Sequence, residues 1–259
     1  MSKKTRYNAR MIALQLKHEK KIQTKIRQWL EFSKTEIIKG INKQMIRKDQ
    51  ADTIVMELTD WIVIENNGMT TIKPAILYAI AEAGQEGYKV GGIQLVFDML
   101  HPSTVELAQT ITADLVREVT DETKAAIRLA IRDGANQGKS MQQIGKRIKP
   151  LVGLTQKQVI AVANHEERLL IDKPHFTRAQ IDRNVARYEN RLHRGRAKTI
   201  SRTETARTVD EATLLAYAEA GVDAEWVTRG ELACDICAAN EGKIYTVSEA
   251  RGLLPAHPN

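Results

Sequence analysis

Aromatic side chains are scarce in this sequence. Three Trp, three Phe and six Tyr make up only 5% of its 259 residues. Large sheets favour aromatic and β-branched side chains, whereas the common residues here are Ala, Leu, Glu, Lys, Arg and Gln, which favour helices. We therefore expect a mainly helical protein, and the chain is long enough to bury a substantial core.

Long apolar runs are also missing from the sequence. No stretch approaches the roughly 20 residues that cross a bilayer, and the first ten residues, MSKKTRYNAR, have no apolar segment behind their charges. We expect neither membrane association nor a secretory signal, and so a chain that stays in a cytoplasm. Its two cysteines, Cys234 and Cys237, lie three positions apart. In a reducing compartment this spacing indicates a metal site or redox motif before a structural disulfide.

Positive charge is unevenly distributed. The formal net charge is +7, but residues 1–48 contain fourteen Lys and Arg against three Glu, a net charge of +11. A second basic stretch, residues 178–207, has nine bases against three acids. Positive charge this dense indicates that a polyanion or an acidic protein surface lies nearby. The alternative is a helix face that is only exposed to solvent. For the first segment we predict contact with DNA or an acidic partner through Lys17, Lys20, Lys21, Lys25 and Arg27.

Helical periodicity dominates the first 220 residues. Ile22, Ile26, Trp29 and Ile37 share one face of a long basic N-terminal helix. Further helices are predicted over residues 51–65, from Pro74 onward, and over 103–119, 120–133, 140–149, 155–171, 177–194 and 197–220. Helix breaks are predicted at Asn66-Asn67-Gly68, Gly84, Gly87, Gly91-Gly92 and Gly221. Ser103 is predicted to be the N-cap of the helix over residues 103–119, with Glu106 completing a capping box.

The character of the sequence changes after Gly221. From Val222 to Tyr245, β-forming residues are interrupted by Arg229-Gly230 and Glu241-Gly242, a pattern typical of short hairpins. The predicted fold class is mainly α with a small C-terminal β-hairpin-rich module (α+β). A long basic N-terminal helix would be followed by a helical domain.

The C-terminal third contains an ordered series of motifs. It runs from Ile200-Ser201-Arg202-Thr203-Glu204-Thr205-Ala206-Arg207 through Trp226-Val227-Thr228, Cys234-Asp235-Ile236-Cys237 and Asn240-Glu241-Gly242-Lys243 to Pro255-Ala256-His257-Pro258-Asn259. This series resembles the phage Mu F-like head-morphogenesis domain of tailed-phage minor capsid proteins. That family's pattern is an Arg-Thr-Glu-Thr helix start, a Trp-bearing strand, a Cys-x-x-Cys turn, a Gly turn and a Pro-x-His-Pro-Asn-Cys-Arg-Cys close. The stretch from Gly134 to Ile148 resembles the family's leading helix, so the resemblance covers roughly residues 125–259.

The resemblance implies a structural virion protein and not an enzyme. Such a minor capsid protein associates with the portal protein, other head proteins and packaged double-stranded DNA, and assists head assembly and genome delivery. It would lie in the head interior or at the portal vertex, and in the host cytoplasm during assembly. The implied domains are a helical region over residues 1–120 and a Mu F-like domain over residues 121–259, with the β-rich module from about residue 222.

A structural zinc ion is the cofactor that these motifs allow. Cys234, Cys237 and His257 supply three of the four ligands that structural zinc needs. In the family, a cysteine directly after the counterpart of Asn259 could supply the fourth. Two reduced cysteines beside a turn, with an ordinary histidine, are the simpler alternative. A thioredoxin-like redox role lacks the βαβ pattern that it requires.

A polar cluster formed by Arg202, Glu204 and Arg207 is predicted at a helix start, with Thr203 or Thr205 as cap. Glu204 and Arg207 are spaced to pair on one helix face. We interpret the cluster as structural, because no motif places a nucleophile or second acid beside Glu204 for general base catalysis. Two other functions stay open: a sequence-independent nucleic-acid-binding protein, and a zinc-dependent hydrolase that uses the Cys/His ligands with one open position.

Overall fold

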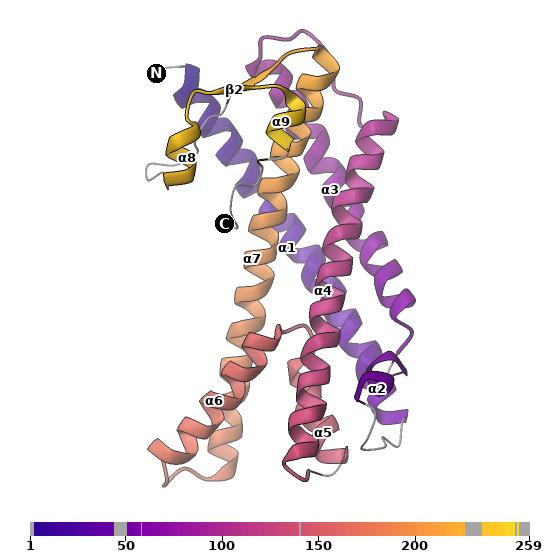
Figure 1. Ribbon diagram of the computed structural model, residues 1–259, viewed down its shortest axis with the longest axis vertical. Helices are drawn as coiled ribbons and strands as arrows, with labels where there is room; N and C mark the ends of the chain where they lie inside the picture. Colours follow the sequence, from indigo (N-terminus) through magenta and orange to yellow (C-terminus); the bar gives the residue numbers. More distant parts are fainter. Residues whose placement is uncertain are drawn as a thin grey trace. The chain divides into compact units, whose positions relative to one another are not determined.

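The computed structural model describes residues 3–43, 51–57, 59–139, 141–225, 235–251 and 253. They are mainly helical, as predicted (Figure 1). None of the helices in this described part is both long enough and apolar enough to cross a membrane. The helices are α1 (Lys3–Lys43), α2 (Ala51–Glu57), α3 (Trp61–Val90), α4 (Pro102–Asn136), α5 (Met141–Ile148), the 3-10 turn η1 (Lys149–Leu151), α6 (Gln156–Asp172), α7 (Arg178–Ala220), α8 (Asp235–Asn240) and α9 (Val247–Arg251).

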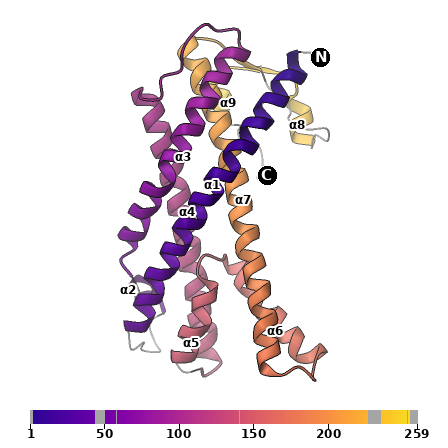
Figure 2. The same ribbon diagram turned by 180° about the vertical axis from the view of Figure 1, so that it is seen from behind.

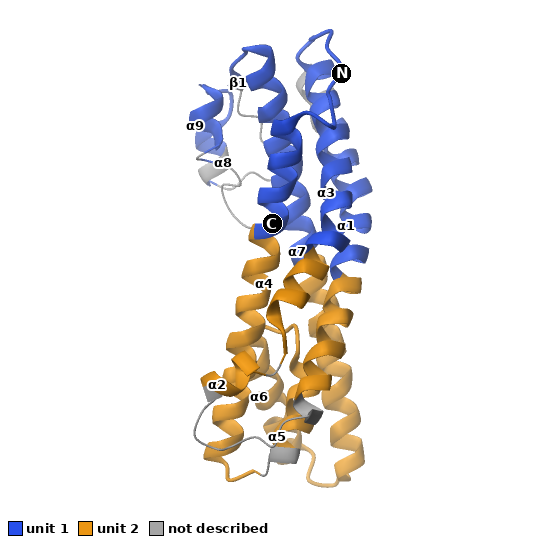
Figure 3. Ribbon diagram, turned by 90° about the vertical axis from the view of Figure 1, so that its right-hand side faces the viewer, with its two compact units in different colours: residues 1–26, 69–113, 199–259 blue, residues 27–68, 114–198 orange. Residues whose placement is uncertain are grey.

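The chain forms two compact units that interleave along the sequence (Figure 3). Unit 1 contains residues 1–26, 69–113 and 199–259, and unit 2 contains residues 27–68 and 114–198. The divisions fall within α1, α3, α4 and α7, so each unit contains a part of all four helices. The predicted domain boundary at residue 120 lies within α4.

Unit 1 is held together by an apolar core and by polar contacts between α1, α3 and α7. The N-terminal half of α1 lies beside α3 (Figure 2), where Arg10 pairs with Glu86 at 3.0 Å. Tyr88 on α3 donates a 2.7 Å hydrogen bond to Glu219 on α7. Burial and this acidic partner raise the pKa of Tyr88 to about 12. The buried apolar side chains of α1 and α3 in this unit include Met11, Ile22, Ile26, Ile72, Ile76 and Ile80.

Unit 2 is centred on two buried tryptophans. Trp29 on α1 donates a 2.9 Å hydrogen bond to the carbonyl oxygen of Ile64 on α3, and Trp61 donates one of 2.9 Å to the carbonyl oxygen of Val55 on α2. Asp52 on α2 binds Arg128 and Arg132 of α4 at 2.9 and 3.1 Å. The surrounding core includes Ile37, Val116, Val119, Ile127, Ile131, Ile144, Ile148, Leu151 and Leu154.

The predicted break at Asn66-Asn67-Gly68 is wrong. α3 begins at Trp61, where Asp60 caps it by accepting a 3.0 Å hydrogen bond from the Ile62 amide, and it continues to Val90 through Pro74, Gly84 and Gly87. Gly84 lies so close to Phe97 that a Cβ atom would meet the ring at 2.4 Å. These glycines permit close packing and do not end the helix, which stops only before the Gly91-Gly92 pair.

The predicted division between a helix over residues 103–119 and another over 120–133 is also wrong, because α4 is one 35-residue helix. It starts with Pro102, which suits a first helical position, so Ser103 lies inside the first turn and is not the N-cap. Thr120, the expected start of a second helix, is buried in the middle. The predicted separation of residues 177–194 from 197–220 is wrong in the same way, because α7 runs unbroken through Gly195. α7 does end at the predicted place, with Gly221 at φ +67°.

The C-terminal module contains less β-structure in its described residues than the sequence predicted. β1 (Ala224–Glu225) pairs antiparallel with β2 (Ile244–Tyr245), and the helix α8 lies between them in the chain. The hairpin-rich module is therefore not confirmed, and Trp226 and Val227, part of its basis, lie outside the described residues. A small apolar cluster of Leu214, Ala224 and Ala250 joins α7 to β1 and α9, with Tyr217, Tyr245 and Val247 packed against it.

Candidate functional site

The predicted zinc ligands lie largely outside the described part of the chain. Cys234 and His257 are not among the described residues, and Cys237 lies in α8. Among the side chains that are described, no group of three or more His, Cys, Asp or Glu could hold a metal ion. The zinc site stays a prediction.

The predicted contact residues of α1 fall into two groups. Lys17 donates to both carboxylate oxygens of Glu82 at 2.7 and 2.6 Å, and this hydrogen bonding raises the pKa of Lys17. The ammonium group of Lys21 lies 4.8 Å from the ring centroid of Tyr78 on α3. Lys25 also has a partner. The side chains of Lys20 and Arg27 are exposed and make no hydrogen bond or ion pair with the described residues, so they are available to a partner.

Glu82 is the centre of the α1–α3 contact. Its Oε2 lies 3.0 Å from Nε2 of His18, a fully buried histidine of α1. Burial lowers the pKa of His18 despite this carboxylate, so the imidazole is neutral near pH 7. Burial alone would raise the pKa of Glu82, but hydrogen bonds from Lys17, Tyr78 and His18 lower it. This network fixes α1 against α3, and it explains why Lys17 is less free than the sequence suggested.

The predicted polar cluster lies in the middle of α7 and not at a helix start, so the proposed caps Thr203 and Thr205 are wrong. Glu204 is buried, with its Oε2 4.0 Å from Nη1 of Arg207, while Arg202 is exposed. Among the described residues, an ion pair further along the helix joins α7 to the C-terminal elements. There Arg251 of α9 lies 3.5 Å from Glu211.

Four arginines of α7 form an exposed row that the sequence analysis did not resolve. Arg183, Arg187, Arg191 and Arg194 are spaced by four, four and three residues, which places them on one helix face. Arg191 stacks on Tyr188 at 5.2 Å, and Arg194 donates only to the carbonyl oxygen of Asn190 in the same helix, at 3.3 Å. No carboxylate in the described residues pairs with any of the four. We call this row the α7 arginine stripe.

Two other bases of this segment, Arg178 and Arg196, are neutralised within unit 2. Arg178 is held by Glu166 at 2.7 Å and by Asp182 at 2.8 Å. Arg196 is buried and forms an ion pair with Glu122 of α4. The spacing of the stripe was visible in the sequence, because all four arginines lie within the helix predicted over residues 177–194, but which of the segment's bases lack acidic partners was not.

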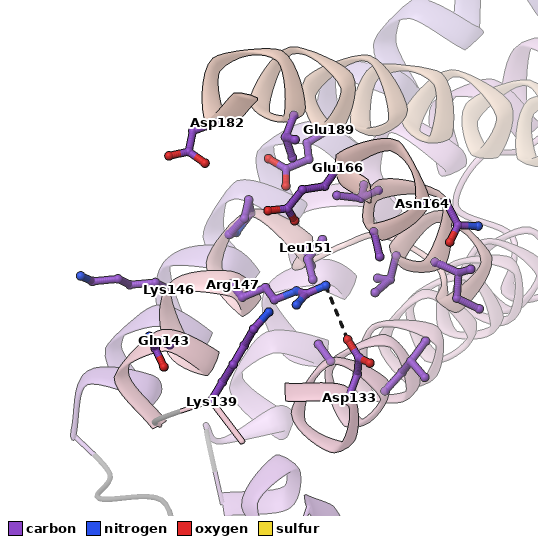
Figure 4. Close-up of a pocket in the computed structure, with 18 of the residues that line it drawn as sticks. Asp133, Lys139, Gln143, Lys146, Arg147, Leu151, Asn164, Glu166, Asp182 and Glu189 are labelled. Carbon is purple, nitrogen blue, oxygen red and sulfur yellow. Dashed lines mark ion pairs between the residues drawn. The ribbon is translucent and has the colours of Figure 1, made fainter. Parts of the chain in front are cut away.

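Unit 2 also contains a cavity of about 820 Å³ between α4, α5, α6 and α7. Its walls are partly apolar, with Leu151, Val159 and Val162 among them, and it contains several charged side chains (Figure 4). The Arg147 guanidinium is 3.5 Å from the Asp133 carboxylate. The carboxyl groups of Glu166 on α6 and Glu189 on α7 face each other across one end of the cavity.

Glu189 is the least satisfied ionisable group of this cavity. Its exposed fraction is 8%, and it makes no hydrogen bond or ion pair with the described residues. Burial, with a smaller contribution from the charge of Glu166, raises its pKa to about 7, while Lys34 of α1 acts in the opposite direction. The carboxyl group of Glu189 is therefore partly protonated at neutral pH.

No family model, no curated protein and no solved structure matches this chain. Functional inference therefore depends on the chain's own motifs, charges and geometry.

Proposed function

We propose that this protein is a structural minor capsid protein of a tailed phage, associated with the portal vertex and packaged DNA, and that it assists head assembly and genome delivery without enzymatic activity. The order of the C-terminal motifs, from Arg202-Thr203-Glu204-Thr205 to Pro255-Ala256-His257-Pro258-Asn259, supports the family. The proposed partners are the portal protein, other head proteins and double-stranded DNA. The hairpin-rich arrangement of the C-terminal module belongs to this proposal.

The α7 arginine stripe is the observation that carries the DNA contact. Guanidinium groups bind phosphate in a bidentate manner, and they lose less hydration than ammonium groups on binding. From Arg183 to Arg194 the helix rises about 16 Å, a length over which duplex DNA carries roughly ten phosphate charges. Four cations on one rigid face, with no acidic partner among the described residues, therefore fit a DNA backbone. Lys20 and Arg27 of α1 can add to this attraction.

Zinc binding by Cys234, Cys237 and His257 is part of the same proposal. Two thiolates and an imidazole are ligands that suit zinc, which would stabilise a small module with few apolar residues. Metal analysis of a chain extended by Cys-Arg-Cys after Asn259, compared with a Cys234→Ala, Cys237→Ala variant, tests this site. One zinc per chain that the variant loses is expected, and equal zinc in both excludes these ligands.

The DNA contact is tested by replacing three residues of the stripe. We expect the variant Arg183→Ala, Arg187→Ala, Arg191→Ala to bind duplex DNA more weakly and to reduce the slope of log affinity against log salt by about 3, because each phosphate contact contributes about 0.9. Fluorescence anisotropy over a range of salt concentrations measures both quantities.

A matched control removes the same charge elsewhere. Lys89, Arg117 and Arg132 lie near Glu86, Asp114 and Asp52, so their replacement by Ala should change the slope much less. An equal decrease in DNA affinity and in salt slope in both variants would mean that DNA binding depends on net charge alone. An unchanged affinity in the stripe variant would exclude the stripe as the DNA surface.

A sequence-independent nucleic-acid-binding protein is the second candidate, because the stripe by itself is compatible with it. The two functions differ in the portal contact. Co-purification with portal protein at high salt, and density for the protein at the portal vertex of a prohead reconstruction, support the minor capsid protein. Absence from purified virions and proheads would exclude it.

A further inference from the structure

The cavity of unit 2 brings together two carboxyl groups that lie 23 positions apart in the sequence. Glu166 projects from α6 and Glu189 from α7, and their carboxyl groups face each other (Figure 4). Arg178 donates a 2.7 Å hydrogen bond to Glu166. No cation reaches Glu189 in the described residues, because Lys34 acts on it only through its charge at longer range. One end of the cavity therefore has an excess of acceptors.

Two carboxyl groups that face each other destabilise the fold when no cation lies between them. A carboxyl group that is only 8% exposed and makes no hydrogen bond with the described residues is poorly solvated, and two adjacent carboxylates repel each other. Buried polar groups in proteins are nearly always paired. A cationic donor placed between Glu166 and Glu189 would supply hydrogen bonds to both and cancel their repulsion.

The rest of the cavity defines what the ligand must carry besides its charge. Leu151, Val159 and Val162 provide an apolar wall suited to a hydrocarbon stem, and a volume of about 820 Å³ is sufficient for a small ligand or for several side chains of a partner. Lys139 extends into the cavity from the α5 side without a partner in the described residues. It would repel a second positive charge, so a ligand with one cationic group fits better than a polyamine.

We propose that this cavity binds an alkyl guanidinium or alkyl ammonium group, with the cation between Glu166 and Glu189 and its stem against the apolar wall. The same chemistry is found in a free monoamine or guanidine and in an Arg or Lys side chain of a partner protein. A metal ion is a weaker fit, because the described residues offer no group of three or more acidic, His or Cys ligands here. The site does not depend on the proposed virion function.

Calorimetric titration of the full chain with butylguanidinium and with the peptide Ala-Leu-Arg-Leu-Ala, blocked at both ends, tests the site. Binding of either probe is expected to be about ten-fold tighter at pH 8 than at pH 6, because the cation requires ionised Glu189, whose pKa is about 7. Glu166 and Lys34 act on Glu189 through their charges, and the other charged groups that line the cavity are Asp133, Lys139, Lys146, Arg147, Arg178 and Asp182. Tighter binding of the peptide identifies a partner side chain as the source, and tighter binding of butylguanidinium identifies a free ligand.

The Glu189→Gln variant should lose at least ten-fold in affinity at pH 8 and should lose the pH dependence. Glu167→Gln, an exposed position on α6 that does not line the cavity, is the matched control and should bind as the unmodified chain does. No binding of either probe at millimolar concentration, equal binding by both variants, or equally tight binding of Mg²⁺ would overturn the proposal. DNA affinity measured on Glu189→Gln should be unchanged, which separates this site from the α7 arginine stripe.

Discussion

At the scale of single residues, helical glycines decide how closely the core can pack. A Cβ atom at Gly68 would lie 2.8 Å from both the Trp29 ring and Val116, so the side chains of α1 and α4 occupy the space that any other residue would need. The sequence Asn66-Asn67-Gly68 has the composition of a turn. The packing of Trp29 against Gly68 outweighs the local preference of these three residues for a turn.

Replacing Gly68 by Ala should therefore destabilise the protein, although Ala is the better helix former by about 1 kcal/mol. Overpacking against Trp29 and Val116 costs about 1–3 kcal/mol and outweighs this gain. Gly195→Ala is the control, because Gly195 lies within α7 with no atom within 4 Å of a new Cβ, and it should stabilise by about 0.5–1 kcal/mol. Urea unfolding of both variants measures the difference, and a stabilised Gly68→Ala would show that α1 packs less closely than described.

The buried carboxyl group of Glu189 should make stability depend on pH. Its pKa is raised from 4.5 in the unfolded chain to about 7 in the fold, so the unfolded state loses its proton first as pH rises. Glu189 therefore lowers stability progressively between pH 4.5 and pH 7, and by a constant amount above pH 7.

Glu189→Gln, which cannot ionise, should be more stable than the unmodified chain at pH 8 by up to about 3 kcal/mol, and little different at pH 4.5. Chemical denaturation at both pH values, with the ligand of the cavity absent, measures this difference. Glu167→Gln should be as stable as the unmodified chain at both pH values. A Glu189→Gln variant that is less stable at pH 8 would mean that the native carboxylate has a partner.

At the scale of elements, the long helices continue through residues that usually end helices. α3, α4 and α7 contain Gly68, Gly84, Gly87, Gly134 and Gly195. A glycine costs a helix about 1 kcal/mol, whereas each large apolar side chain buried nearby contributes about 1.5–3 kcal/mol. Burial of the apolar faces therefore determines helix length here, and single glycines do not.

α6 is an element whose start was predicted correctly, and its cap can be tested. Thr155 Oγ1 accepts a 3.2 Å hydrogen bond from the Gln158 amide, and Gln158 Oε1 accepts one of 3.0 Å from the Thr155 amide. Because the Gln158 amide loses its acceptor, Thr155→Ala should cost about 1 kcal/mol. The midpoint of urea unfolding should fall with an unchanged slope.

A second threonine provides the comparison for this cap. Thr35 lies in the middle of α1, where its hydroxyl donates only to the Glu31 carbonyl oxygen, so Thr35→Ala should be neutral or slightly stabilising. An equal loss of unfolding free energy in Thr155→Ala and Thr35→Ala would show that the cap hydrogen bonds do not stabilise α6.

At the scale of the whole molecule, each compact unit is assembled from segments that are distant in the sequence. In unit 2, Trp29 of α1 donates to Ile64 and packs near Gly68 and Val116, all of which precede residue 120. In unit 1, Tyr88 binds Glu219 across 131 positions. A fragment that begins at residue 121 therefore lacks core partners in both units.

We expect the isolated fragment 121–259 to unfold without cooperativity and to bind the hydrophobic dye ANS, because its buried apolar faces have lost their partners. Mixing it with the fragment 1–120 should restore a cooperative transition. Thermal unfolding followed by circular dichroism measures this. Cooperative unfolding of 121–259 alone would instead support the domain boundary predicted at residue 120.

Properties that depend on near neighbours in the chain could be predicted from the sequence. Periodicity and local turn chemistry predict the mainly helical class and the long α1 with Ile22, Ile26 and Trp29 on its buried face. They also predict the start of α6 and the end of α7 at Gly221. The two basic segments were likewise visible as charge counts. Such features are encoded within a few residues, where local preferences act.

Which helices continue and which charged side chains lack partners among the described residues depends on tertiary contacts. Lys17 is bound by Glu82, 65 positions away, whereas Arg183, Arg187, Arg191 and Arg194 have no acidic partner among the described residues. Glu189 faces Glu166 only because α6 and α7 pack together in unit 2. These outcomes arise from contacts between distant segments, and burial there outweighs the local preferences that a sequence displays.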